Sequence, residues 1–329
     1  MTDNDSIDLA HEATTTSAAD IPTTMRAVRF DEYGDRSVLH VAEVATPAAT
    51  GDRVLVQVRA AGVNPGEAAI RQGAMEAVAP ASFPSGQGTD LAGVVVAIGE
   101  DVSGFSVGDE VLGWSWERSS QAEFVSVPEG QLVLKPRRLS WEVAGGLDIV
   151  GTTAYAAVRA VDPKPGETVV VSSAAGGVGS IVTQLLHAKG VDVIGIASEA
   201  NHDWLRELGA RPIAYGDGLE GRVRDLATNG IDALIDTHGE EYVRLGVTLG
   251  VPADRIETII AFDAAAEIGA KAEGSQAASD PAVLRELANL VADGTVVVPI
   301  AATYPLDRVQ DAYEELEQRH TRGKIVLVP

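Results

Sequence analysis

A glycine-rich turn between an apolar strand and a helical pattern is the segment of this sequence with the clearest chemistry. The apolar run 168–171 leads into Ser172-Ser173-Ala174-Ala175-Gly176-Gly177-Val178-Gly179, and apolar residues then recur with helical spacing. Glycines at the third and sixth positions of such a turn let the backbone approach a pyrophosphate and let the helix pack on the strand. The N–H groups at the start of the helix attract phosphate. The turn therefore predicts dinucleotide binding through Ala175, Gly176, Gly177, Val178 and Gly179, with Ala174 replacing the first glycine.

The end of the second strand indicates which dinucleotide is bound. Units that bind NAD usually place an acidic residue there, where it accepts a hydrogen bond from the ribose 2′-hydroxyl. In this chain the strand 191–196 is followed by the neutral pair Ala197 and Ser198. Ser198 can donate to a phosphate and His202 is a nearby positive candidate, whereas Glu199 would repel a phosphate or replace the missing acid. We therefore predict NADPH, with Glu199 as the opposing feature.

Strands and helices are predicted to alternate around this turn. Strands are expected at 168–171, 191–196 and 233–236, and helices at 178–188 and 203–208. This βαβ series predicts a parallel sheet. Small and polar residues make up the stretch 262–278. We expect it to be followed by a helix at 280–292, a strand at 296–300, a helix through Val309, Tyr313 and Leu316, and a strand at 324–328.

The first part of the chain, from Met25 to about Gly146, is predicted to consist of short strands separated by turns. Residues 53–59 alternate between apolar and polar, and 94–98 form a continuous apolar run. The fold class is therefore α/β, with a doubly wound parallel sheet and a separate β-rich part.

Composition excludes several classes of function. The 329 residues carry 25 Lys and Arg against 48 Asp and Glu, a net charge of −23 that disfavours nucleic acid and anionic membrane surfaces as partners. Cysteine is absent, which excludes a thiol nucleophile and cysteine-ligated zinc. Residues 1–24 are acidic and lack the features of a secretory signal, so we expect a disordered tail and a cytoplasmic protein.

Four segments of the sequence resemble one enzyme family. They are 61–65 (Ala-Gly-Val-Asn-Pro) with Arg71 and Gly73, 88–95 (Gly-Thr-Asp-Leu-Ala-Gly-Val-Val), 108–111 (Gly-Asp-Glu-Val) and the glycine-rich turn. Together they resemble the zinc-independent branch of the medium-chain dehydrogenase/reductases, the quinone oxidoreductase (zeta-crystallin-like) group, from Met25 to the end. The resemblance implies a GroES-like catalytic domain at 25–147 and 276–329, and a Rossmann NADPH-binding domain at 148–275.

The resemblance also implies roles for single residues. Asn64 is similar to the active-site Asn beside the nicotinamide, and Thr153 to the Thr that holds the nicotinamide end. Ser198, His202 and Tyr215 match the 2′-phosphate region, with His202 in place of a common Lys. The remaining cofactor positions that it implies are Thr237, His238, Ala261, Phe262 and Arg319.

Metal binding is not expected. Zinc-dependent relatives bind a catalytic zinc through Cys, His and Cys, and the matching positions here are Asn64, Thr89 and Ile149. Those three side chains cannot replace the Cys–His–Cys set. The resemblance therefore implies no metal.

The residues expected to line the substrate site differ from the pattern of the family. Relatives that reduce quinones often carry an Asp and then Tyr residues just after the Asn, where this chain has Glu67, Ala69 and Met75. We expect Trp114 and Trp116 to provide a flat apolar surface for the substrate instead.

These observations predict an NADPH-dependent, zinc-free oxidoreductase that transfers hydride to a quinone or an α,β-unsaturated carbonyl. Asn64 and the backbone would stabilise the oxyanion, and water would supply the proton. The alternatives are an enoyl-thioester reductase of a biosynthetic pathway and a non-catalytic NADPH-binding redox sensor. The partner is a small-molecule electron acceptor. A homodimer is expected through the edge strand 255–262, whose Ile256, Ile259 and Ile260 are too apolar for a free edge.

Overall fold

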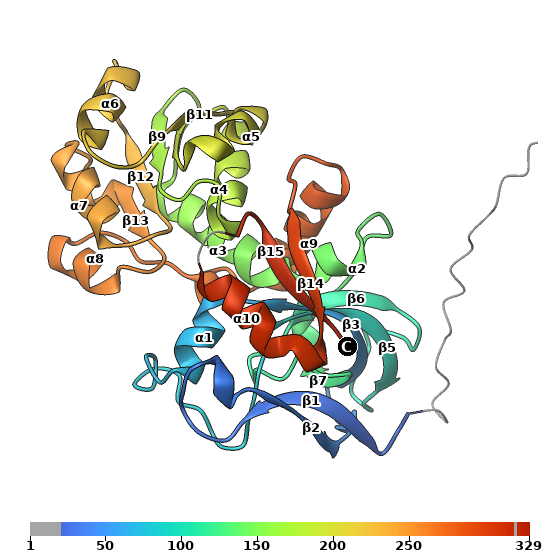
Figure 1. The fold of residues 1–329 in the computed structure, drawn as a ribbon. Helices are drawn as coiled ribbons and strands as arrows, with labels where there is room; N and C mark the ends of the chain where they lie inside the picture. The colour runs from blue at the N-terminus through green and yellow to red at the C-terminus, as the bar shows by residue number, and fades with distance from the viewer. Residues whose placement is uncertain (1–20, 319–320) are drawn as a thin grey trace, which may run out of the picture.

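The computed structural model describes residues 21–318 and 321–329 (Figure 1). Most of the predicted tail and the predicted cofactor residue Arg319 lie outside these ranges. The tail prediction extends too far, because Thr24 begins the first strand, β1 (Thr24–Phe30), and Ile21 packs against the core around Met25 and Phe124.

The β-rich part contains two sheets. Strands β2 (His40–Ala45), β1 and β4 (Ser85–Gly86) form a three-stranded sheet. A seven-stranded sheet follows the order β14 (Ile300–Pro305), β15 (Lys324–Val328), β3 (Arg53–Val63), β5 (Asp90–Ile98), β6 (Glu110–Trp114) and β8 (Leu132–Leu134), with β7 (Phe124–Pro128) paired to β3. The alternation in 53–59 is confirmed as part of β3, whose Val54, Val56 and Val58 are buried. The C-terminal strands thus complete the sheet that the N-terminal strands begin.

The parallel sheet is confirmed. Its order is β11 (Ala210–Ile213), β10 (Asp192–Ile196), β9 (Thr168–Val171), β12 (Ala233–Asp236) and β13 (Ile256–Thr258), and every pair is parallel. The helices that belong to it are α4 (Gly177–Ala188), α5 (His202–Glu207), α6 (Leu219–Leu226), α7 (Glu240–Thr248) and α8 (Phe262–Ile268). From β9 the sheet grows outward through β10 and β11 on one side and through β12 and β13 on the other, so the strand order reverses between β9 and β12. The carboxyl ends of these two strands form the crevice in which such sheets bind ligands. The α/β class with a Rossmann sheet follows.

Other helices connect and cover the sheets (Figure 1). Helix α10 (Val309–Glu317) covers the β-rich part beside β14 and β15, and Tyr313 on it is fully buried. The remaining elements are α1 (Pro65–Arg71), α2 (Trp141–Gly145), α3 (Asp148–Val161), α9 (Pro281–Ala292) and the 3-10 turns η2 (Arg36–Val38), η3 (Glu129–Gln131), η4 (Glu199–Asn201), η5 (Ala253–Arg255), η6 (Ser275–Ala277) and η7 (Leu306–Arg308). None of the helices in the described ranges is long and apolar enough to cross a membrane.

One expected strand is wrong in this fold, and two helices were not predicted. Residues 296–299 form no strand, because the side-chain amide of Gln184 binds both the N–H and the carbonyl of Val297 in place of a neighbouring strand. Helix α8 lies within the stretch of small and polar residues at 262–278, for which no helix was predicted. Helix α3 was missed; 11 of its 14 residues are buried, so it lacks the polar stripe that reveals an amphipathic helix.

The expected edge strand 255–262 is also wrong in its extent. Strand β13 has only three residues, and Ile256 is fully buried. Its outer side is covered at one point, since Lys271 donates to the carbonyl of Ile256 and accepts from the N–H of Thr258. Of the three isoleucines, Ile260 is 44% exposed.

The division of the chain into two domains at residues 148 and 276 remains a proposal. These positions fall at the start of α3 and in η6.

Candidate cofactor and active site

The turn before α4 has the geometry of a phosphate-binding site. Helix α4 begins after Gly176, no side chain caps its N-terminus, and its first turn holds no acidic residue. A Cβ on Gly179 would overlap the carbonyl oxygen of Ser173, so only glycine allows the helix to approach the turn this closely. Ser173 itself adopts a left-handed conformation with φ of 44°. The uncapped N–H groups and the helix dipole are therefore available to an anion.

Asp236 fixes the crevice at the carboxyl ends of three strands. It is fully buried, and its Oδ1 accepts from Ser172 Oγ (2.6 Å) and from the N–H of His238 (2.9 Å). Its Oδ2 accepts from Thr258 Oγ1 (2.7 Å). Thr237 is held in the same place, because its Oγ1 donates to the carbonyl of Ser172 (2.8 Å). Asp236 was not predicted as a site residue, although an acid at the end of a buried strand is a usable signal.

His238 and Phe262 lie at the same end of the sheet but are more open. The ring of His238 packs edge-on against Tyr242 at 5.5 Å between ring centres, and its Nε2 lies 3.5 Å from Glu241. Phe262 is 51% exposed, and the N–H of Ala261 donates to Thr258 Oγ1 (3.0 Å). These predicted cofactor positions are thus brought to one edge of the sheet.

The end of β10 presents neutral donors. Ser198 Oγ accepts from Asn201 Nδ2 (3.0 Å), which leaves the Ser198 hydroxyl hydrogen free to donate. His202 Nε2 is buried without a hydrogen-bond partner in the described part of the chain. Glu199 is exposed, and Tyr215 is 58% exposed. An unpartnered buried imidazole nitrogen beside a free hydroxyl suits a phosphate.

Two arginines near this region were missed by the sequence reasoning. The guanidinium of Arg222 donates to the backbone carbonyls of Ala214 (2.7 Å), Asp217 and Tyr215, and no carboxylate in the described ranges neutralises it. Arg322 lies 5.3 Å from the ring centre of Trp204, so the C-terminal segment rests against α5. No sequence pattern linked Arg222 to Tyr215, because the contact depends on the course of the loop before α6.

Asn64 lies in a buried polar network. It is 2% exposed, and its Oδ1 accepts from Lys324 Nζ (2.5 Å). Its Nδ2 donates to Glu67 Oε1 and to Asp90 Oδ2, each at 3.1 Å. Lys324 also donates to Asp90 Oδ2 (3.3 Å) and to the carbonyl of Val63 (3.2 Å), which uses all three of its N–H groups. Both hydrogens of the Asn64 amide are therefore directed at carboxylates.

Glu67 is the centre of this network. It is 3% exposed and accepts from the N–H of Asn64 (3.1 Å), the N–H of Thr89 (2.8 Å) and the Tyr313 hydroxyl (2.9 Å). Burial, and then the charge of Asp90, raise the pKa of Glu67, while the donors around it and the Lys324 ammonium oppose that shift. Because the groups that contact Glu67 are mostly hydrogen-bond donors, we expect the site to stabilise the carboxylate form of Glu67.

The three positions that hold zinc in the metal-dependent relatives are joined by two carboxylates. Glu67 binds Asn64 and the N–H of Thr89, and Asp90 Oδ1 accepts from the N–H of Ile149 (2.8 Å). Within residues 21–318 and 321–329 no group of three or more His, Cys, Asp and Glu side chains could hold a metal. Beside Ile149, burial and the charge of Asp90 raise the pKa of Asp148 well above its ordinary value.

This network borders the phosphate-binding turn. A Cβ on Gly177 would lie 3.4 Å from Val150 Cγ1 and 3.8 Å from the carbonyl oxygen of Gly323. The starts of α3 and β15 therefore lie directly beside the turn. Thr153, one turn further along α3, is 7% exposed and donates its hydroxyl to the carbonyl of Ile149 (2.5 Å), which leaves its oxygen free to accept.

The prediction for Trp114 is wrong, whereas Trp116 remains a candidate. Trp114 is 3% exposed and belongs to the hydrophobic core, so it presents no flat surface to a substrate. It ends β6 opposite Asp90, and that register turns its ring inward. Trp116 is 39% exposed.

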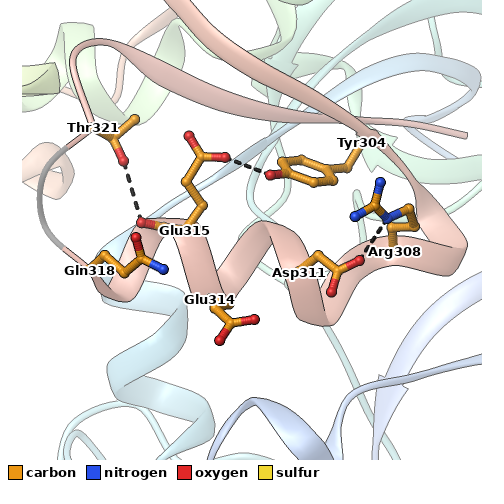
Figure 2. Close-up of a pocket in the computed structure, with 7 residues that line it drawn as sticks. All are labelled: Tyr304, Arg308, Asp311, Glu314, Glu315, Gln318 and Thr321. Carbon is orange, nitrogen blue, oxygen red and sulfur yellow. Dashed lines mark hydrogen bonds and ion pairs between the residues drawn. The ribbon is translucent and has the colours of Figure 1, made fainter.

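A hollow of about 510 Å³ lies on the outer face of α10, and Figure 2 shows the side chains that line it. It is lined by Tyr304, Arg308, Asp311, Glu314, Glu315, Gln318 and Thr321. Tyr304 donates to Glu315 (2.5 Å), and Arg308 donates to Asp311 (2.6 Å), so these groups bind one another. None of the predicted site residues within 21–318 and 321–329 lines this hollow.

Comparison with known proteins gives consistent matches. Two family models match: the alcohol dehydrogenase GroES-like domain over residues 50–137 and the zinc-binding dehydrogenase over residues 208–327. A chloroplastic NADPH-dependent alkenal/one oxidoreductase of Arabidopsis thaliana is 31% identical, over 95% of this chain and 82% of the relative. The quinone oxidoreductase of Mus musculus is 28% identical, over 92% and 98%. The solved quinone oxidoreductase from Coxiella burnetii superposes with a TM-score of 0.81 at 28% identity, over 93% and 99%.

Proposed function

This chain is an oxidoreductase of the medium-chain dehydrogenase/reductase family, and we propose that it transfers hydride from NADPH to a quinone or an α,β-unsaturated carbonyl compound. The names of its relatives specify alkenals, alkenones and quinones. The observation that carries the proposal is the uncapped start of α4, which lies beside the neutral end of β10 and next to the buried Asn64 network.

We assign cofactor binding to residues of the parallel sheet and α3. When bound, the nicotinamide supplies the hydride. The N–H groups that follow Gly176 hold the pyrophosphate, and the absence of a side chain at Gly179 keeps the helix close to it. Thr153 accepts a hydrogen bond at the nicotinamide end. The positions that border the cofactor at the strand ends are Thr237, His238, Ala261 and Phe262.

NADPH is the expected cofactor because the two residues that follow β10, Ala197 and Ser198, are neutral. Ser198 donates to the 2′-phosphate, and His202 offers an imidazole nitrogen that has no other partner in the described residues. Arg222 adds a positive charge beside Tyr215. Glu199, which is exposed directly after Ser198, is the feature that opposes this assignment.

Asn64 is the proposed catalytic residue. Hydride addition to a conjugated carbon leaves negative charge on the carbonyl oxygen, and an N–H donor stabilises that oxygen. Lys324 binds Asn64 Oδ1 and so polarises the amide toward stronger donation from Nδ2. The substrate oxygen must take over one of the hydrogen bonds that Nδ2 now makes to Glu67 and Asp90. Water supplies the proton that completes the reduction.

The test is NADPH oxidation, followed by absorbance, with benzoquinones, alkenones and enoyl thioesters as acceptors. We expect turnover with quinones or alkenones, and we expect it to survive a metal chelator. Tight NADPH binding without turnover would favour the redox sensor, and turnover with thioesters alone would favour the enoyl-thioester reductase. One zinc per chain by elemental analysis, with activity lost on its removal, would refute the zinc-free mechanism.

A further inference from the structure

Arg29 is an unusual arginine in this chain. Among residues 21–318 and 321–329, it is the one half-buried arginine whose guanidinium makes no hydrogen bond or ion pair; the other arginines without such a partner are exposed. Neighbouring arginines show the common arrangement: Arg26 pairs with Glu123, and Arg53 with Glu117. In a protein with so many more acids than bases, an unpaired and partly buried cation needs an explanation.

The position of the Arg29 guanidinium is built into the sheet. Arg29 lies in the middle strand β1, opposite His40 on one side and Gly86 on the other. A Cβ on Gly86 would lie 2.7 Å from Arg29 Nη1, so the glycine provides the space that the guanidinium occupies. The same point lies 3.4 Å from Ser119 Cα, which places the guanidinium beside the loop that follows β6.

This guanidinium lines a hollow of about 330 Å³. That volume is at the lower end of the range for pockets that bind small molecules. The polar side chains around it are Arg29, Arg53, Glu117, Ser119 and Ser126. The rest of the lining is apolar and consists of Met25, Ala45, Pro47, Ala48, Phe124 and Val125.

The hollow carries one uncompensated positive charge. Arg53 donates to both oxygens of Glu117 (2.8 and 2.9 Å) and to Ser126 Oγ (3.0 Å), so the charges of Arg53 and Glu117 offset each other. Arg29 has no such partner, and burial lowers its pKa. A bound anion would restore the interaction that burial removes.

We propose that this hollow is a binding site for a small carboxylate with a short apolar body. The carboxylate pairs with the Arg29 guanidinium, whose planar fork of N–H donors suits two carboxylate oxygens. The apolar body lies on Met25, Phe124 and Val125, which form the floor. One cation matches one anionic group, and the apolar floor distinguishes a carboxylic acid from an inorganic anion. The site lies outside the cofactor crevice and does not depend on the proposed reductase activity.

Isothermal titration calorimetry of the full chain tests the proposal with hexanoate, hexanamide and inorganic phosphate. We expect hexanoate to bind at one saturable site, and hexanamide and phosphate to bind at least tenfold more weakly. Arg29→Gln should weaken hexanoate binding at least tenfold. Arg138→Gln removes an exposed arginine with no hydrogen bond or ion pair in the described residues, and it should leave binding unchanged.

A second variant works in the opposite direction and keeps the test decisive if Arg29→Gln does not fold. Glu117→Gln removes the acid that offsets Arg53, so hexanoate should bind a few times more tightly. The proposal is overturned if wild type shows no saturable hexanoate binding. It is also overturned if folded Arg29→Gln binds as wild type does, or if Glu117→Gln weakens binding. None of these readouts involves NADPH, so they separate this site from the reductase activity.

Discussion

The Lys324 ammonium donates a 2.5 Å hydrogen bond to Asn64 Oδ1, across 260 residues of sequence. Lys324 is 4% exposed and Asn64 is 2% exposed. The last strand of the chain thus reaches the residue that precedes α1. Asp90, fully buried, joins both groups through its Oδ2. These hydrogen bonds connect the C-terminal strand β15 to the buried network around Asn64.

Lys324→Met should destabilise the protein strongly. The substitution leaves Asp90 buried without its cation, and removing one partner of a buried pair costs about 3–5 kcal/mol. Urea unfolding followed by circular dichroism measures the change. The matched control is Lys164→Met, since Lys164 is exposed and pairs with exposed Asp162; its effect should be about 0.5 kcal/mol or less. If both variants lost a similar amount of unfolding free energy, the burial of Lys324 would not contribute to stability as proposed.

Gly179→Val should abolish NADPH binding and leave the β-rich part folded. The added side chain would overlap the Ser173 carbonyl and move α4 away from the turn. NADPH fluorescence titration measures binding, and circular dichroism measures folding. Gly221→Ala is the control, because a Cβ there meets no atom within 4 Å on the exposed side of α6. Unchanged NADPH affinity in Gly179→Val would refute the assignment of the turn.

Wild type should use NADPH with at least tenfold higher kcat/KM than NADH, a difference of about 1.4 kcal/mol. Ala197→Asp should reverse the preference, because it adds an acceptor for the 2′-hydroxyl and repels a 2′-phosphate. Steady-state kinetics with both cofactors measures the ratio. If wild type uses NADH equally well and Glu199→Ala raises NADPH use alone, then Glu199 controls the choice and the interpretation of Ala197 is wrong.

Stability should fall as the pH rises from about 4.5 to about 8 because of Glu257. Burial raises the pKa of Glu257 from 4.5 to about 8, so over this interval the folded protein keeps a proton that the unfolded chain has lost. Each pH unit then costs about 1.4 kcal/mol. Glu257→Gln cannot ionise, so its unfolding free energy should vary less with pH and exceed that of wild type at pH 8. Exposed Glu207→Gln should retain the wild-type slope, and an unchanged slope in Glu257→Gln would contradict the prediction.

The homodimer remains a prediction. The exposed apolar surface that could form its interface is smaller than the sequence indicates, because Ile256 is buried. Ile260 and Phe262, at 44% and 51% exposed, are the open apolar side chains beyond β13. Light scattering should give about twice the chain mass of 34.2 kDa. Ile260→Asp should shift the protein toward monomer. A wild-type monomer at micromolar concentration would refute the dimer.

Local patterns were sufficient for much of the parallel sheet. The predicted strands 168–171 and 233–236 agree with β9 and β12, and the helix at 178–188 agrees with α4 to within one residue. These elements have strong apolar periodicity or short apolar runs between turns, and both signals depend on neighbouring residues alone. The predicted helix 280–292 likewise agrees with α9 to within one residue, and the Asp280 side chain caps its start.

Elements whose environment comes from distant residues were not predictable in this way. The apolar run 296–300 predicts a strand, but the Gln184 side chain forms hydrogen bonds with the N–H and the carbonyl of Val297. Helix α3 is buried on nearly all sides, so no polar stripe revealed it. Trp114 was placed beside the substrate, whereas the register of β6 against β5 puts it in the core.

By itself, the sequence determined the α/β class, the glycine-rich turn and the neutral end of β10, because each is a property of a short segment. Only the tertiary structure showed that the Asn64 amide forms hydrogen bonds with Glu67, Asp90 and Lys324. The same is true of Asp236, which joins the ends of three strands. Hydrogen bonds between groups up to 260 residues apart leave no periodic trace in the sequence. They form only when the packed sheets exclude water, since buried polar groups must then find partners within the protein.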